Sequence, residues 1–95
     1  MRLIPENVLL GFLGDCIGLS AEILPRLQAS GTSPVGPELL KKYHDLIAGL
    51  QGQKRADSVL CDESWEWIWE IREGMSYIQV YGRLAWLNYN LFDLL

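Results

Sequence analysis

The chain has 95 residues, of which 49% are hydrophobic and 21% are charged, and its net charge is −4. This length is enough for one domain with a modest core, and the hydrophobic content excludes a disordered chain. The excess of acidic over basic residues disfavours non-specific binding to nucleic acid or to an anionic membrane. We therefore predict a single domain over residues 1–95.

The first third of the chain contains a long apolar run, but its pattern does not predict a membrane protein. A spanning helix needs about 20 apolar residues, and Asp15 and Glu22 interrupt this run. A signal peptide is disfavoured as well, because Pro5, Glu6 and Asn7 precede the apolar residues and no good cleavage site follows. The expected location is the cytoplasm, with no membrane contact.

The first predicted helix covers residues 5–28. Pro5 suits the first helical position, and Pro25 is expected to end or kink the helix near its C-terminal end. Gly11, Gly14 and Gly18 recur inside the helical pattern at steps of three and four. Small residues at this spacing let another helix approach closely, within one chain or between two copies. The apolar stripe of this helix contains Leu9, Leu13, Cys16, Ile17, Leu24 and Leu27.

The second predicted helix covers residues 37–51. A loop at 29–37 precedes it, because this stretch contains two glycines, two prolines, two serines and a threonine. Pro37 suits the first helical position and Gly52 is a natural stop. Glu38 and Lys42 have the spacing of a favourable i,i+4 ion pair. The apolar stripe contains Leu39, Leu40, Tyr43, Ile47 and Leu50.

The stretch SWEWIWEI, residues 64–71, fits two secondary structures. With a period of two, its three tryptophans share one face of a strand, and Glu73-Gly74 is a turn into a second strand. With the helical period, an apolar row continues for about seven turns, and Asp62 is placed to cap a helix that begins there. The glutamates that then fall in one helical row are Glu63, Glu66, Glu70 and Glu73.

We favour the helix, because the alternation fails at Ile68 whereas the helical rows persist to Tyr89. Gly74 and Gly82 oppose this choice, since each costs up to about 1 kcal/mol in a helix interior. The predicted fold is all-α, a small helical bundle of three main helices at 5–28, 37–51 and 62–90. The alternative is an α+β fold with two helices and a β-hairpin at 64–81.

A helix over 62–90 has two apolar faces, because each residue turns by about 100°. Trp67 lies on one of them, together with Ile68, Ile71, Met75 and Ile78, and we assign that face to the core. The second face then needs a further cover, which is the C-terminal tail at 88–95, a second copy of the chain or a different protein. The members of this second face are Trp65, Trp69, Val80 and Leu87, interleaved with Arg72, Ser76 and Arg83.

No catalytic or metal-binding motif rises above background in the sequence. His44 is the only histidine, and neither Cys16 nor Cys61 lies in a known nucleophile signature. One histidine and two cysteines without close spacing do not suit zinc. We interpret both cysteines as reduced core thiols, with a disulfide as the alternative, and predict a protein that is not an enzyme and uses no cofactor or metal.

The leading hypothesis is a non-enzymatic protein–protein interaction module that binds a larger protein through its aromatic-rich helix face. Eight of the ten aromatic residues lie between Trp65 and Phe92, and interfaces are enriched in Trp, Tyr and Arg. In size and charge the chain resembles small acidic inhibitors such as immunity proteins, antitoxins and phage-encoded inhibitors, a resemblance that assigns no residue. The predicted partner-binding residues are Trp65, Trp69, Arg72 and Arg83, with Glu66, Glu70 and Glu73 setting orientation and association rate.

Two other classes of function and a homodimer are the alternatives. A small-ligand-binding domain, enzymatic or not, places its pocket between the aromatic residues, near Cys61 and His44. A small nucleic-acid-associated regulator requires a basic surface, which the acidic balance of the chain disfavours. Its residues would be Lys41, Lys42, Lys54 and Arg55, two basic pairs near one end of the bundle.

Overall fold

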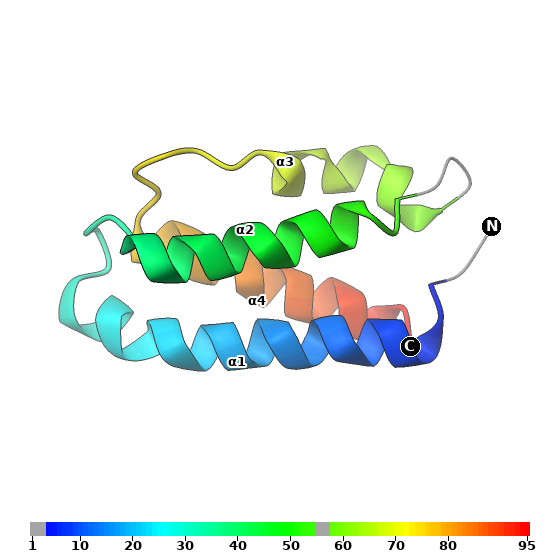
Figure 1. The fold of residues 1–95 in the computed structure, drawn as a ribbon, viewed down its shortest axis with the longest axis horizontal. Helices are drawn as coiled ribbons and strands as arrows, with labels where there is room; N and C mark the ends of the chain where they lie inside the picture. The colour runs from blue at the N-terminus through cyan, green and yellow to red at the C-terminus, as the bar shows by residue number, and fades with distance from the viewer. Residues whose placement is uncertain (1–3, 55–57) are drawn as a thin grey trace.

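The computed structural model describes residues 4–54 and 58–95, which form an all-α fold (Figure 1). α1 covers Glu6–Ser30 and α2 covers Pro37–Gln51. Two short 3-10 turns, η1 at Val59–Cys61 and η2 at Glu63–Trp65, lead into the short helix α3 at Glu66–Trp69, and α4 covers Tyr77–Asp93. The all-α class is confirmed. The β-hairpin alternative is wrong, because the described residues contain no strand.

α1 and α4 are antiparallel and pack together over much of their length. α2 lies beside α1, and α3 lies on the side of α2 that faces away from α1 (Figure 1). The resulting shape is elongated, with principal extents of 42 × 22 × 19 Å. This matches the roughly 37 Å expected for a 25-residue helix.

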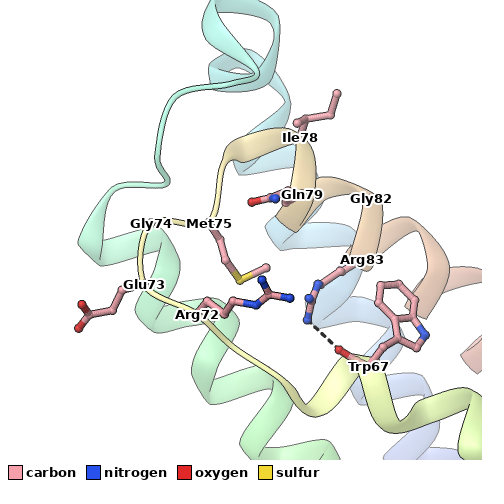
Figure 2. A pocket seen from close by; sticks show the side chains of 9 residues that line it. All are labelled: Trp67, Arg72, Glu73, Gly74, Met75, Ile78, Gln79, Gly82 and Arg83. Atoms are coloured by element: carbon pink, nitrogen blue, oxygen red, sulfur yellow. Dashed lines mark hydrogen bonds between the residues drawn. The ribbon is translucent and has the colours of Figure 1, made fainter.

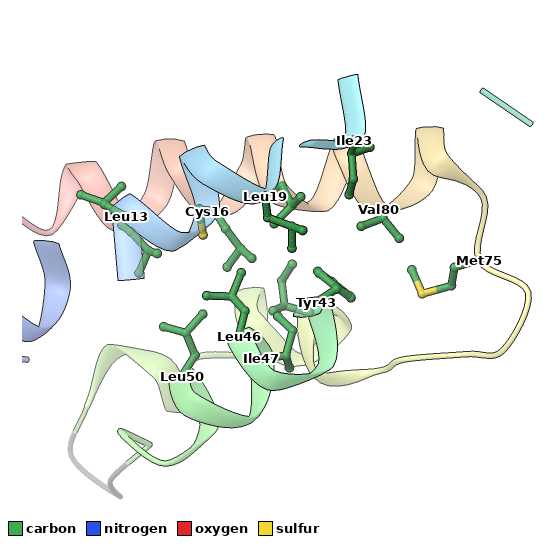
Figure 3. Packing of buried hydrophobic residues seen from close by; sticks show 14 of the residues in the cluster. Leu13, Cys16, Leu19, Ile23, Tyr43, Leu46, Ile47, Leu50, Met75 and Val80 are labelled. Carbon is green, nitrogen blue, oxygen red and sulfur yellow. The ribbon is translucent and has the colours of Figure 1, made fainter. Parts of the chain in front are cut away.

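The buried core lies where α1, α2 and α4 meet (Figure 3). On α1 the buried residues recur every three or four positions, and Cys16 and Ile23 are fully buried. The predicted stripe is therefore only partly right, because Ile17 and Leu24 are exposed. Residues of α2 and α4 in the core are Tyr43, Leu46, Ile47 and Leu50, and Val80, Leu84, Leu87 and Leu91.

The first two helices lie close to their predicted positions, with two corrections. α1 continues through Pro25 to Ser30. Pro25 removes the helical hydrogen bond to the carbonyl of Ala21, and both residues lie on the exposed side of the helix. α2 begins at Pro37 as predicted. Lys42 is not paired with Glu38, however; its Nζ donates to Oε1 of Glu22 at 2.7 Å and so links α2 to α1.

The predicted continuous helix over 62–90 is wrong, because the chain leaves the helical conformation between Trp69 and Tyr77. Glu70 has an extended conformation with ψ of 120°, and Gly74 has a φ of +77°, a region that favours glycine. The chain then enters α4 through a capping box. Ser76 Oγ accepts a hydrogen bond from Gln79 N at 3.3 Å, and Gln79 Oε1 accepts one from Ser76 N at 2.9 Å.

The loop between α1 and α2 holds the start of α4 in place. Val35 N donates to Met75 O at 2.8 Å, Tyr77 N to Ser33 O at 3.1 Å, and Ile78 N to Gly31 O at 2.9 Å. These bonds satisfy two of the N-terminal amides of α4 that have no partner inside the helix. The direction of α4 along α1 is therefore set by a segment far away in the sequence.

The glycines of α1 form no close helix contact inside the chain, which was one of the two arrangements that we predicted for them. A Cβ atom added at Gly11, Gly14 or Gly18 would meet no atom within 4 Å, so these positions face open space. By length and composition α1 is long and apolar enough to cross a membrane, as the core helices of soluble proteins and signal sequences also are. Its apolar residues divide between the buried core side and an exposed side.

Candidate functional site

The three tryptophans of SWEWIWEI have different environments. Trp65 is only 3% exposed, Trp69 is partly buried and Trp67 is 41% exposed. We predicted that Trp65 and Trp69 share one side and that Trp67 points away, which the structure confirms. We assigned the wrong side to the core. α3 and α4 are separate helices, so the face that α4 buries does not decide which face the tryptophan segment buries. Trp65 and Ile68 both pack into the core.

Trp65 is covered by other aromatic rings and not by a folded-back tail. Its ring stacks on Trp69 at a centroid distance of 6.2 Å and meets the edge of Trp86 of α4 at 4.8 Å. Residues 88–93, which we considered as the cover, simply continue α4. Edge-to-face and offset pairs at these distances contribute about 0.5–1.5 kcal/mol beyond burial. Trp65 and Trp86 therefore anchor α3 to α4.

Arg83 of α4 fastens the end of α3. Its Nη1 donates to the backbone oxygen of Trp67 at 2.9 Å and also to that of Glu70, and its guanidinium lies 5.3 Å from the centroid of the Trp67 ring. Carbonyl groups at the end of a helix have no partner inside it, so a cation placed there stabilises the terminus. Arg83 was predicted as a partner-binding residue, and it has a structural role as well.

An open groove of about 620 Å³ lies between the 70–76 segment and α4, beside Trp67 (Figure 2). In Figure 2 the guanidinium groups of Arg72 and Arg83 point toward one another across this groove, and Glu73 points away from it. Two arginines and one glutamate give the lining a local positive excess on an acidic protein. The remaining lining residues are Gly74, Met75, Ile78, Gln79 and Gly82.

The predicted site residues are only partly brought together. Arg72 and Arg83 line the groove, whereas Trp65 and Trp69 do not. Glu66, Glu70 and Glu73 are all exposed, but the break in the helix divides the predicted glutamate row among α3 and the 70–76 segment. Glu70 Oε2 lies 3.7 Å from Arg72 Nη2, an exposed pair of small energetic value. Trp67 lines the groove, although we did not predict it as a binding residue. The helical spacing already placed it on the opposite side from Trp65, so an inward Trp65 implies an outward Trp67.

The basic residues of the nucleic-acid alternative do not form one surface. Lys41 pairs with Asp45 at 3.9 Å, and Lys42 pairs with Glu22. Lys54 lies past the other end of α2, with its Nζ 5.8 Å from the Trp69 ring centroid. Lys42 and Gln51, the last residue of α2, are nine helical residues apart, which corresponds to roughly 14 Å, and Lys54 lies beyond Gln51. The predicted grouping of the lysines near one end is wrong, and Arg55 lies outside the described residues.

The two cysteines also differ in environment. Cys16 is fully buried, and burial raises the pKa of its thiol to about 12, with the Asp15 carboxylate adding to the rise. Cys61 is exposed and not a core residue as predicted, and no disulfide joins the two. His44 is exposed on α2, and neither His44 nor Cys61 lines the groove. Within residues 4–54 and 58–95, no three His, Cys, Asp or Glu side chains are grouped for a metal ion.

Tyr43 is the largest fully buried side chain, and its hydroxyl lies in the core near Arg83. Burial raises the pKa of Tyr43, and the charge of Arg83 opposes this rise. The Tyr43 hydroxyl has no hydrogen-bond partner among the residues that the structure describes. Because it is sealed from solvent, we assign it to the core and not to the groove.

Comparison with known proteins gives no relative: no family model, no curated protein and no solved structure matches the chain.

Proposed function

We propose that this small helical bundle is a non-enzymatic interaction module that binds a larger protein at the groove beside Trp67. It acts as an inhibitor or adaptor in the cytoplasm. The observation that carries the proposal is the groove itself, where an exposed tryptophan lies next to two arginines that face one another. Tryptophan and arginine are the side chains most often found as energetic anchors of interfaces.

The lining indicates the chemistry of the partner. Arg83 directs Nη1 to the backbone of α3, while Arg72 is exposed and has only a weak pair with Glu70. The positive excess between them suits a carboxylate group, because a guanidinium binds a carboxylate through two parallel hydrogen bonds. The partner therefore presents an acidic side chain beside an apolar one, which packs on the exposed part of Trp67.

The exposed glutamates have a secondary role in this proposal. Glu66 and Glu70 lie on or beside α3, outside the lining of the groove. Charges at the rim of an interface mainly change the association rate and its dependence on salt, and they select against wrong partners. We assign them to orientation of the partner and not to the main binding energy.

Three variants test this function once a partner has been captured with the tagged wild-type chain. Trp67→Ala and Arg72→Glu are each expected to raise the dissociation constant about 10–100-fold, the usual effect of removing an interface anchor. Tyr89→Ala is the matched control, because Tyr89 is an aromatic residue that is 74% exposed and does not line the groove. It should change the constant less than about twofold.

The measurement is isothermal titration calorimetry at two salt concentrations. If Trp67→Ala and Arg72→Glu bind the partner as tightly as the wild type does, the groove is not the binding site. If Tyr89→Ala alone weakens binding, the partner binds elsewhere on α4. Circular dichroism of each variant verifies that the helices are intact.

A further inference from the structure

α4 exposes an apolar row that is separate from the groove-lining tryptophan. Ile78, Ala85 and Phe92 lie seven residues apart and, together with Gly82 and Tyr89, follow one another at steps of four and three. Ile78, Tyr89 and Phe92 are 57%, 74% and 69% exposed. We predicted Ile78 on the core face and Val80 and Leu87 on the outer face. The structure reverses this assignment, since Val80 and Leu87 are fully buried.

α1 exposes a second row with the same spacing. Leu10, Ile17 and Leu24 are 52%, 60% and 37% exposed, and they also lie seven residues apart. Gly14 and Ala21 fill the intervening steps of four and three, and both are exposed. The ten positions of the two rows contain no charged side chain. This is the spacing by which helices pack side by side in coiled coils and helical bundles.

The two rows border the same seam between α1 and α4. On α1, Glu22 and Phe12 face α2, as the Lys42 pair and the contact with Gly49 show. At about 100° per residue Ile17 points about 140° away from both, toward the α4 side. On α4, Trp86 and Arg83 face α3. Ala85 points about 100° away from Trp86 and about 160° away from Arg83, and so toward the α1 side.

The rows are self-complementary, with large and small residues in alternation. On an antiparallel second α1, one register places Leu10 against Ala21 of the other copy and Ile17 against its Gly14. Small residues of this kind let helix axes approach to the short end of the usual 8–10 Å. Gly14 is exposed at the edge of the open groove between α1 and α2, and a Cβ added there would meet no other part of the chain within 4 Å, so the position has room for a neighbouring helix.

The exposed apolar area fits a second copy. Tyr89 and Phe92 alone expose roughly 280 Å² between them. With the half-exposed aliphatic side chains beside them the face reaches on the order of 700 Å², above the largest apolar area of most monomers and near the 800 Å² that each partner of a stable complex buries. A two-fold interface brings the same surface of both copies together. Because the two rows contain no charged residue, this pairing causes no like-charge repulsion between them.

We propose that this outer face of α1 and α4 is a homodimer interface, in which two copies pack antiparallel α1–α4 pairs against each other about a two-fold axis. The interface does not include Trp67 or Arg72, so partner binding at the groove and dimerisation are separable. Ile78 and Gly82 lie at the boundary between the two surfaces, since they also line the groove.

Two variants test the dimer by sedimentation equilibrium and light scattering on the full chain. Wild type is expected at twice the 10.8 kDa monomer mass, about 21.6 kDa. Ile17→Glu places a charge in the face and should raise the dimer dissociation constant at least about 100-fold. Gly14→Gln fills the space at the close approach and should do the same while leaving the monomer folded, because Gly14 is exposed and a Cβ at this position meets no other part of the monomer within 4 Å. His44→Glu on the exposed side of α2 is the matched charge control and should remain dimeric.

Several outcomes would overturn the dimer. A wild-type chain that stays at 10.8 kDa up to about 1 mM contradicts it, and so does a dimer that both face variants retain. A monomer that binds neutral phosphatidylcholine vesicles, and loses this binding with Ile17→Glu, shows that lipid covers the face instead. Circular dichroism at a concentration where all variants are monomeric verifies that Ile17→Glu and Gly14→Gln are folded.

Discussion

At the scale of single residues, Trp65 and Trp67 are two positions apart and contribute to different properties of the molecule. Trp65 is buried between Trp69 and Trp86, whereas Trp67 is 41% exposed, with its ring against the edge of Trp86 at 5.2 Å and beside the Arg83 guanidinium. The Trp67 ring is therefore free to contact another molecule at the cost of few internal contacts. The Trp65 ring is not.

Alanine substitutions separate these two roles by stability. Trp65→Ala is expected to lower the free energy of unfolding by about 3–5 kcal/mol, the range for removing a buried aromatic ring. Trp67→Ala should lower it less, by roughly 1–3 kcal/mol, because Trp67 is 41% exposed and less apolar area is therefore lost with its ring than with that of Trp65. Urea unfolding followed by circular dichroism measures both. Equal losses in the two variants would show that Trp67 belongs to the core.

At the scale of elements, the break between α3 and α4 decides which faces are buried. Gly74 is the one described residue with a positive φ, and a residue with a β-carbon is strained in this conformation. Gly11, by contrast, is an exposed glycine in the middle of a regular helix with open space around it. The same substitution should therefore have opposite effects at the two positions.

Gly74→Ala is expected to lower the free energy of unfolding by roughly 1–2 kcal/mol, because alanine is disfavoured in the left-handed region. Gly11→Ala should raise it by about 1 kcal/mol, because alanine has the higher helix propensity. Both changes are measured by urea unfolding at low micromolar protein concentration. If Gly74→Ala raises the free energy of unfolding as Gly11→Ala does, Gly74 has no positive φ in solution and the predicted helix over 62–90 is continuous there.

The sequence predicted the helices whose signals are local and missed the break, which is partly non-local. The ends of α2 follow from Pro37 and Gly52, and α1 from its apolar period. The capping box at Ser76 and Gln79 has a local signature in the sequence, which we did not use because the long helical rows pass through it. The hydrogen bonds from the 31–36 loop that fix the start of α4 join residues 40 or more positions apart, and no pattern in one sequence indicates them.

At the scale of the whole molecule, three helices seal one buried thiol. Cys16 has no exposed surface, and its pKa of about 12 lies well above the model-compound value of 9.0. The unfolded chain loses this proton first as the pH rises, so unfolding becomes more favourable above pH 9, and the stabilising effect is complete only below it. Tyr43, whose pKa burial also raises from 10.0, adds to the same trend at higher pH.

The free energy of unfolding should therefore fall between pH 8 and pH 10 by about 1.4 kcal/mol on account of Cys16, from the 1.36 kcal/mol that corresponds to one pKa unit. Cys16→Ala should remove this part of the fall, although it lowers stability at every pH by leaving a cavity. Leu13→Ala is the control, because it also leaves a cavity on α1 but has no proton to lose, so its pH dependence should match that of the wild type. Urea unfolding at pH 8, 9 and 10 measures all three chains. A wild-type curve as flat as that of Cys16→Ala would mean that the thiol is accessible in the folded state, and that α1 does not seal the core.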